Sequence, residues 1–350
     1  MRTIATIKDV ARDADVSVAT VSNILNNTRF VSEELTNRVL ESVKKLSYNI
    51  NNVGRNLRCK KTNMIGVVLQ NVNDVFFSEI LLGLEETLRK LNYKLIFINT
   101  NYNFEEEKNA IATLRTMWVD GIILDSCVHS ENEAEYLEFL LSNGTDKQIP
   151  IVTLEHDLIP GKNAVLTDFF QSSVTATEHL IGLGRKKIVH ITGLKGVSVL
   201  DERERGYTKA MNDANLKPMV YSQGGLLTTS EGYNVTKDIL EQGITFDGLF
   251  AVNDRMAVGA ILAIQDYGLR VPEDVGVIGY DNIKLYNLIS PSLSTINVPK
   301  YKMGAHAANM LIKCIDNDNQ SQPLIKLHTE LIVRKSSDPT ASSKISLNQL

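Results

Sequence analysis

The chain has 350 residues, with 37 lysines and arginines against 41 aspartates and glutamates, which gives a formal net charge of −4. This length exceeds that of one ordinary domain and predicts two or three. No apolar stretch approaches the roughly 20 residues that span a bilayer, and charges near the N-terminus argue against a signal peptide. Cys59, Cys127 and Cys314 lack a metal-ligand spacing. We therefore expect a cytoplasmic protein with reduced thiols, no metal and no cofactor.

The charges are divided unevenly along the chain. Residues 1–62 contain eleven lysines and arginines and six acidic residues, or about +5, whereas the remainder contains 26 and 35, or about −9. A basic head on an acidic body indicates a nucleic-acid-binding module joined to a part that does not touch nucleic acid.

The first fifty residues predict three short amphipathic helices. Ser17 and Ser32 are placed as N-caps of the second and third helices. Apolar residues recur at helical spacing in each, namely Ile7, Val10, Ala11 and Ala14, then Val21, Ile24 and Leu25, then Leu35, Val39, Val43 and Leu46. Two helices joined by so short a turn and braced by a third form a helix-turn-helix, whose second helix enters the major groove of DNA.

The outward face of the second predicted helix favours DNA binding over a generic helical cap. Between Ser17 and Asn26 its outer positions are small or hydrogen-bonding and carry no charge. A face that is only solvated would normally carry lysine and glutamate pairs. An uncharged polar face is typical of a surface that reads bases.

From Met64 onward, strands alternate with helices. Strands are expected at 64–70, 93–100, 120–126 and 149–156, and again at 186–193, 248–254 and 275–281, with helices between them. This order predicts an α/β core of two doubly wound lobes with parallel sheets, of the periplasmic-binding-protein type. Trp118 is expected to pack beneath the strand that follows it. Ligands bind such sheets beyond the carboxyl ends of their strands.

The predicted domain boundaries are a helix-turn-helix head at 1–49, a hinge at 50–62 and a core at 63–335. Lobe 1 is expected at about 63–163 and 293–321, and lobe 2 at about 164–292 and 322–335. The Ser/Lys/Asn-rich residues 336–350 are expected to form a disordered tail.

Motifs for enzymatic chemistry are missing from the sequence. It contains no GxGxxG, Walker-type loop, GxSxG or HExxH, and its six histidines are dispersed. We therefore predict that the protein is not an enzyme.

Several of these motifs, in this order, resemble the lactose/galactose repressor (LacI/GalR) family. The resemblance runs over residues 5–335 and is carried by TIKDVARDADVSVATVSNILNN, VGRNLRCKKTNMIGVV, VDGIIL, HLIGLGRKKIVHI, NDRMAVGAILAIQDYGLRVPEDVGVIGYDN and SPSLSTI. It implies a homodimeric DNA-binding regulator, most simply a repressor of carbohydrate genes, whose core binds a small effector that alters its affinity for a pseudo-palindromic operator.

The resemblance also implies which residues of the head bind DNA. Base edges would be read by Val18, Ala19 and Asn23, where asparagine can bridge adenine but cannot replace the arginine of many relatives. Phosphates would be contacted by Thr6, Ser17, Thr20, Ser22, Asn26 and Arg29. In the hinge, Leu57 would be the apolar wedge in the minor groove, with Arg55 and Arg58 beside it.

In the core, the resemblance places the effector between the lobes. The candidate contacts are Phe76, Phe77, Arg203, Asn253, Asp254 and Asp281, with weaker candidates at Asn71, Asp74, Asp125, Glu155, Asp168 and Leu227. Helix capping is an equal alternative for Asp254, and a surface loop is one for Asp168. Leu227 stands where relatives often carry an aromatic ring.

Two other functions remain open on the sequence alone. A solute-binding transport protein shares the two-lobe core, but it would need a secretory signal and no basic head. A regulator controlled by a partner protein such as a phosphocarrier shares every motif, and only the polar set in the cleft favours a small ligand.

Overall fold

The computed structural model describes residues 5–26, 29–48, 61–142, 149–317 and 320–341. The chain forms two compact units that divide between Thr62 and Asn63. Each unit has its own hydrophobic core, so the two are described separately.

The small unit consists of three helices, α1 (Ile7–Asp13), α2 (Val18–Asn26) and α3 (Glu33–Lys45). The apolar positions that recur at helical spacing meet in one core. Its buried members are Val10, Ala11, Ala14, Val21 and Val39, and partly buried residues such as Ile24 and Leu46 pack against them.

The turn between α1 and α2 is held from two sides. Asp15 adopts a left-handed conformation with a φ of 52°, which lets the chain reverse. The guanidinium of Arg38 on α3 donates to the carbonyl oxygens of Ala14 (2.6 Å) and Asp15 (3.1 Å), groups that the end of α1 leaves without helical partners. At the start of α2, the Ser17 hydroxyl accepts from the backbone N–H of Thr20 at 3.0 Å.

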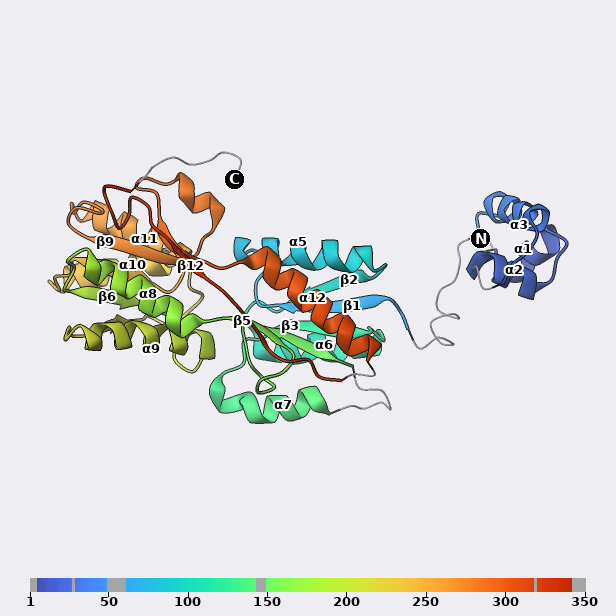
Figure 1. Ribbon diagram of the computed structural model, residues 1–350, viewed down its shortest axis with the longest axis horizontal. Helices are drawn as coiled ribbons and strands as arrows, with labels where there is room; N and C mark the ends of the chain where they lie inside the picture. The colour runs from blue at the N-terminus through green and yellow to red at the C-terminus, as the bar shows by residue number, and fades with distance from the viewer. Residues whose placement is uncertain (1–4, 27–28, 49–60, 143–148, 318–319, 342–350) are drawn as a thin grey trace. The chain divides into compact units, whose positions relative to one another are not determined.

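The large unit contains two lobes, each built on one six-stranded sheet among the described residues (Figure 1). The sheet of lobe 1 has the order β11-β5-β4-β3-β1-β2 and is parallel throughout. Its strands are β1 (Met64–Leu69), β2 (Lys94–Asn99), β3 (Gly121–Asp125), β4 (Ile151–Leu154), β5 (Ala164–Thr167) and β11 (Ile325–Leu327). Its helices are α5 (Val75–Lys90), α6 (Phe104–Thr116), α7 (Glu133–Leu141) and α12 (Lys300–Asp316).

Both faces of the lobe 1 sheet are covered, which explains why β1 is an uninterrupted apolar run. On one face, Ile65, Val67 and Leu69 pack into a core shared with α5 and α12. On the other, Val68 packs with α6 and α7 residues such as Ile111.

Lobe 2 repeats this arrangement with the strand order β12-β10-β9-β8-β6-β7. Its strands are β6 (Ile188–Ile191), β7 (Met219–Tyr221), β8 (Gly248–Ala251), β9 (Gly276–Asp281), β10 (Ser294–Asn297) and β12 (Glu330–Ile332), of which β12 runs antiparallel to β10. Its helices are α8 (Phe169–Gly182), α9 (Ser198–Asp213), α10 (Thr229–Glu241) and α11 (Asp254–Asp266). Two short 3-10 segments, η1 (Ser130–Asn132) and η2 (Lys284–Leu288), lie in loops.

Glycines allow two helix pairs to pack closely. A Cβ at Gly304 on α12 would lie 2.1 Å from the carbonyl oxygen of Ile80 on α5, and a Cβ at Gly259 on α11 would lie 2.0 Å from that of Thr229 on α10. Both helix pairs therefore depend on glycine for their separation.

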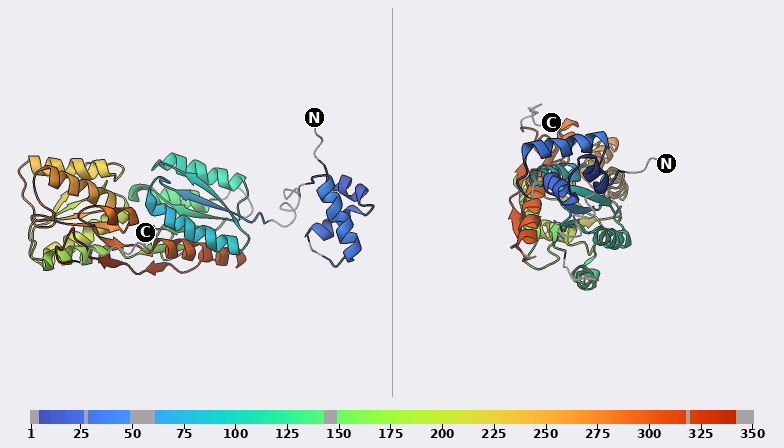
Figure 2. Two further views of the ribbon diagram at one scale, coloured as in Figure 1. Left: turned by 90° about the horizontal axis from the view of Figure 1, so that it is seen from above. Right: turned by 90° about the vertical axis from the view of Figure 1, so that its right-hand side faces the viewer.

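The lobe boundaries differ from those predicted at three places. Strand β5 belongs to lobe 1, so the chain enters lobe 2 after residue 167 and not at 164. Strand β10 belongs to lobe 2, so the chain returns to lobe 1 after residue 297 and not at 293. Of the last two strands, which were both expected in lobe 2, β11 belongs to lobe 1 and only β12 to lobe 2. In the described chain, three segments thus cross between the lobes, which stand end to end in Figure 2. Strands of three or four residues give too little pattern to assign them to a sheet.

The predicted disordered tail begins too early. Ser336 and Ser337 are buried, and Ser336 bonds through its backbone and hydroxyl to Val277 and Ser294. Residues 342–350 lie outside the described chain.

Trp118 also differs from expectation, because 63% of its surface is exposed where α6 ends and the backbone turns with a φ of 58°. Among the described residues, no helix is both long and apolar enough to cross a membrane.

Candidate functional site

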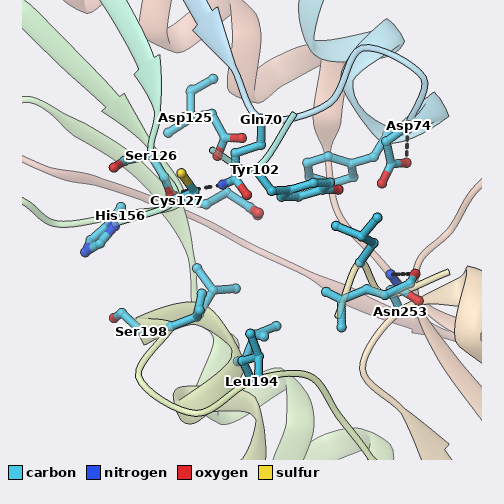
Figure 3. A pocket seen from close by; sticks show the side chains of 18 of the residues that line it. Gln70, Asp74, Tyr102, Asp125, Ser126, Cys127, His156, Leu194, Ser198 and Asn253 are labelled. Atoms are coloured by element: carbon cyan, nitrogen blue, oxygen red, sulfur yellow. Dashed lines mark hydrogen bonds between the residues drawn. The ribbon is translucent and has the colours of Figure 1, made fainter. Parts of the chain in front are cut away.

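A cavity of about 280 Å³ lies between the lobes, beyond the carboxyl ends of strands from both sheets. Lobe 1 contributes the segments that follow β1, β2, β3 and β4, and lobe 2 contributes those that follow β6, β7 and β8, the starts of α9 and α11, and the end of β9. Figure 3 shows Gln70, Tyr102 and Asp125 on one side of the cavity and Leu194 and Ser198 on the other.

Most of the core candidates line this cavity. They are Phe76, Phe77, Arg203, Asn253 and Asp281 from the main set, and Asp74, Asp125, Glu155 and Leu227 from the weaker set. The two phenylalanines stand edge to face, with ring centroids 5.2 Å apart and an interplanar angle of 85°, and form an aromatic wall at the start of α5.

Arg203 is the most deeply placed cation of the cavity. Its Nη1 donates to the carbonyl oxygen of Val252 at 2.6 Å, its Nη2 lies 3.9 Å from Oδ1 of Asp281, and its guanidinium stacks 3.7 Å from the ring centroid of Tyr280. Burial raises the pKa of the Asp281 carboxyl well above its ordinary value, and the positive charge of Arg203 opposes that rise. The pair offers both donors and acceptors to a ligand.

Asn253 has a structural role in addition to any contact with a ligand. Its Oδ1 accepts from the backbone N–H of Met256 at 2.8 Å and caps α11, while its Nδ2 donates to the carbonyl oxygen of Leu227 at 3.1 Å. The side chain therefore joins two segments of the cavity wall.

Two carboxyls from lobe 1 complete the polar part of the wall. Asp125 ends β3 and Glu155 follows β4, and burial raises the pKa of both. Oδ2 of Asp125 and Oε1 of Glu155 are buried and have no hydrogen-bond partner among the described residues.

Asp254 does not line the cavity, so of the two roles considered for it, an effector contact has no support from its position. The carboxyl points into lobe 2, where it accepts from the hydroxyl of Thr295 (2.6 Å) and the backbone N–H of Ile283 (2.7 Å). Burial raises its pKa to about 7. Asp254 is the first residue of α11, and the position before it already supplies the cap, so its side chain is directed inward.

Two weaker candidates also lie outside the cavity lining. Asp168 caps α8 by accepting from Gln171 at 2.9 Å, and its Oδ2 lies 3.6 Å from Nζ of Lys326. Asn71 accepts from the backbone N–H of Asn73 at 3.0 Å in a turn. Both are better explained by local capping.

The sequence reasoning missed an ion pair across the cleft. Nη2 of Arg255, on α11 of lobe 2, lies 2.8 Å from Oδ2 of Asp74, which caps α5 of lobe 1. Both side chains are largely buried and line the cavity. Other lining residues that were missed are Gln70, Tyr102, Ser126, Cys127, His129, Leu154, His156, Leu194, Val197, Ser198, Val199, Leu200, Gly225 and Leu226. Most of them lie in the segments that follow strands, and this position was their only signal in the sequence.

Backbone strain gathers at the same place. Glu155, Leu227 and Asp281 have φ values of 55°, 54° and 106°, which side-chain-bearing residues rarely adopt. Such conformations persist where the surrounding structure enforces them, and they concentrate at binding sites.

In the small unit, the candidates for DNA contact lie on or beside α2. Val18, with 41% of its surface exposed, and Ala19 lie on its outer side, and Asn23 is half-buried. The Ser17 and Thr20 hydroxyls bond to each other at 2.8 Å at the N-terminus of the helix, where an anion is favoured.

The remaining head candidates are placed less uniformly. The backbone N–H and hydroxyl of Thr6 both donate to Asp9, at 2.9 and 2.6 Å, so this hydroxyl already has an acceptor. Ser22 is half-buried on α2, and Arg29 is exposed. Asn26 ends α2, but its side chain lies outside the described structure, as do the hinge candidates Arg55, Leu57 and Arg58.

Metal chemistry finds no support in the described residues, where no group of three or more histidines, cysteines, aspartates or glutamates is placed to hold an ion. Cys127 and Cys314 are free thiols. Burial raises the pKa of Cys127 well above its ordinary value, so this thiol stays protonated.

Comparison with known proteins agrees with both units. The sequence model described as "Bacterial regulatory proteins, lacI family" matches residues 6–51, and that of a periplasmic binding protein-like domain matches residues 177–337. The chain is 36% identical over 334 residues to the HTH-type transcriptional repressor PurR of Pasteurella multocida (strain Pm70), with 95% of this chain and 98% of the relative covered. It is 33% identical over 330 residues to the ribose operon repressor of Halalkalibacterium halodurans, with 94% and 96% covered.

Solved structures give the same result. The lac repressor dimer bound to operator and the anti-inducer ONPF matches with a TM-score of 0.86 at 25% identity, covering 96% of this chain and 99% of that one. The transcriptional regulator CelR in complex with cellobiose matches with a TM-score of 0.69 at 25% identity, covering 95% and 100%.

The chain therefore belongs to the LacI family of bacterial regulatory proteins. Its helix-turn-helix head and two-lobe core make it a DNA-binding transcriptional repressor. The predicted family, fold class and regulatory function are confirmed, and the transport alternative is excluded by the match to the DNA-binding head.

Proposed function

We propose that a small, polar effector of carbohydrate type binds between the lobes and controls the affinity of this repressor for its operator. The observation that carries the proposal is the cavity at the strand ends of both sheets. A ligand that touches both lobes stabilises one arrangement of them over another, and it shifts DNA binding by as much as its affinity differs between the two arrangements.

The chemistry of the wall supports a hydroxyl-rich ligand. Arg203 supplies donors and Asp281 acceptors at one end, and the carboxyls of Asp125 and Glu155 supply acceptors at the other. Phe76 and its neighbour offer an aromatic face against which the apolar side of a sugar ring can pack. A phosphate or carboxylate ligand would meet more negative than positive charge.

A ligand screen with two measurements tests this proposal. Thermal denaturation would be followed with sugars, sugar phosphates and nucleobases, and every stabilising compound would be added to an operator gel shift. A neutral sugar should raise the melting temperature and change operator affinity. If no small molecule stabilises the protein and a phosphocarrier protein tightens DNA binding, control by a partner protein replaces our proposal.

For DNA recognition, we propose that Val18, Ala19 and Asn23 read base edges. The phosphate contacts proposed with them are Thr6, Ser17, Thr20, Ser22, Asn26 and Arg29. In the hinge, Leu57 is proposed as the minor-groove wedge, flanked by Arg55 and Arg58.

Replacing Leu57 with alanine should weaken specific operator binding at least tenfold and leave effector binding unchanged. Unchanged operator affinity in a gel shift would contradict this role. Since operators lie on the chromosome, we place the protein in the cytoplasm.

We also propose that the repressor is a homodimer and that its operator is pseudo-palindromic. Val75 and Leu82 on α5, and Leu285 and Leu288 on η2, are large exposed apolar side chains, and Glu79 of α5 lies 4.0 Å from Lys284 of η2, which brings the two elements together. Such an apolar face is typical of an interface. Analytical ultracentrifugation should show a dimer that Leu82→Asp converts to a monomer; an unchanged dimer would place the interface elsewhere.

A further inference from the structure

Two carboxyls at adjacent strand ends of the effector cavity, those of Asp125 and Glu155, form no ion pair with a lysine or arginine among the described residues. Asp125 is the last residue of β3, and the register of the sheet pairs it with Leu154, the last residue of β4; Glu155 is the next residue along the chain after that pair. Only 4% of the surface of Asp125 is exposed. Both residues line the cavity, and Oδ2 of Asp125 and Oε1 of Glu155 are buried in its wall without a hydrogen-bond partner among the described residues.

The groups around these carboxyls add negative charge or are already engaged. Glu155 and the buried Glu107 both raise the pKa of Asp125 beyond the effect of burial, and Gln70 alone lowers it through hydrogen bonds. For Glu155, burial raises the pKa, the charges of Arg203 and Lys300 oppose the rise, and Asp74 adds a smaller increase.

The cations of the cavity are committed elsewhere. Arg255 is paired with Asp74 at 2.8 Å, and Arg203 is bonded to Val252 and faces Asp281. Lys300 donates to backbone carbonyl oxygens, among them that of Asn282 at 3.2 Å. The carboxyls Asp74, Asp125, Glu155 and Asp281 are thus opposed in the lining by only the guanidiniums of Arg203 and Arg255.

A ligand group that satisfies this pair must donate hydrogen bonds and carry positive charge. A hydroxyl has one donor and no charge, so it cannot offset the charge of two ionised carboxylates. A protonated primary amine has three donors, no acceptor and a full positive charge, so it can bond to both carboxyls and cancel their repulsion. Resting on the effector function proposed above, we propose that the effector carries a protonated amino group, as an amino sugar does, which binds between Asp125 and Glu155.

Matched ligands test this inference. D-glucosamine, D-galactosamine and D-mannosamine would each be compared with the parent sugar and with the N-acetylated sugar, which keep the ring but remove the charge. At least one amino sugar should raise the melting temperature at pH 7, and its two neutral counterparts should bind at least tenfold more weakly. Since binding favours ionised carboxyls, calorimetry in two buffers of different ionisation enthalpy should show protons released.

Variants locate the amino group. Asp125→Asn and Glu155→Gln should each weaken binding of the amino sugar at least tenfold, whereas Asp213→Asn, which neutralises an exposed carboxylate paired with Lys209 on α9, should not change it. Circular dichroism would show that the variants are folded. The inference is overturned if a parent sugar binds as tightly as its amino form, if none of the three amino sugars stabilises the protein, or if Asp125→Asn binds normally.

The same ligands separate this inference from the effector function itself. If only a neutral sugar binds and changes operator affinity in a gel shift, the proposed effector function is supported and the proposal of an amino group on the ligand is wrong. If an amino sugar binds at Asp125 without changing operator affinity, the proposal that the ligand carries an amino group is supported and the proposed effector function is wrong.

Discussion

His190 should make the stability of lobe 2 sensitive to acid. The imidazole is fully buried on β6 between the rings of Tyr207 and Phe250, at centroid distances of 5.1 and 4.9 Å. Its Nδ1 is 2.9 Å from the carbonyl oxygen of Phe250, to which it donates, and its Nε2 has no hydrogen-bond partner among the described residues. Burial, with the charge of Arg203 adding to its effect, lowers the pKa of His190 from 6.5 to about 4.

The size of the effect follows from that pKa. Because the unfolded chain binds a proton near pH 6.5 and the folded protein only near pH 4, the folded state loses stability as the pH falls between these values. At about 1.4 kcal/mol per pH unit, the full loss is roughly 3 kcal/mol. Between pH 7 and pH 4.5 most of it, roughly 2 kcal/mol, should be observed.

The assay compares the wild type with a variant at His190, so that the effects of all other titrating groups on stability cancel. Urea unfolding would be measured at pH 7 and pH 4.5 for the wild type and for His190→Phe, which keeps an aromatic ring and cannot be protonated. The variant loses the bond to Phe250, which costs about 1 kcal/mol at both pH values. The variant should therefore be less stable than the wild type at pH 7 and more stable than the wild type at pH 4.5. His306→Phe, at an exposed position of α12, is the control. A difference between wild type and His190→Phe that does not change with pH would refute the reasoning.

Three further outcomes are expected. A double-mutant cycle on Asp74→Asn and Arg255→Met should give a coupling of about 1–3 kcal/mol in thermal unfolding, because the pair is largely buried; no coupling would contradict it. Asn23→Ala should cost about 1–3 kcal/mol of specific operator binding in a gel shift and leave nonspecific binding unchanged. Gly259→Ala should destabilise by about 2 kcal/mol or more in urea, because its Cβ would overlap the carbonyl oxygen of Thr229 on α10; wild-type stability would contradict this.

The sequence was sufficient for the large elements and for the location of the cavity. Long helices with a regular apolar face and strands buried on both sides can be recognised from periodicity alone. The rule that ligands bind beyond the carboxyl ends of parallel strands supported Asn253 and Asp281, and the family resemblance selected Arg203; all three line one cavity.

Side-chain direction could not be predicted in the same way. Asp254 and Asp281 both stand at strand ends in similar sequence settings, yet one points into the packed interior and the other toward the cleft. Arg255 carried no signal in the sequence, because its partner Asp74 lies in the other lobe, far away along the chain. Such contacts depend on the relative position of two lobes, which no local pattern records.

The three chain crossings between the lobes have a mechanical consequence. Two bodies joined by one strand can rotate about any axis. Three neighbouring connections, at residues 168, 298–299 and 328–329, should restrict sliding and twisting more than bending. The gap between the lobes then has one main degree of freedom. Chemically different ligands would therefore produce the same movement to different extents, and they would be ranked on a single scale from full induction to full repression.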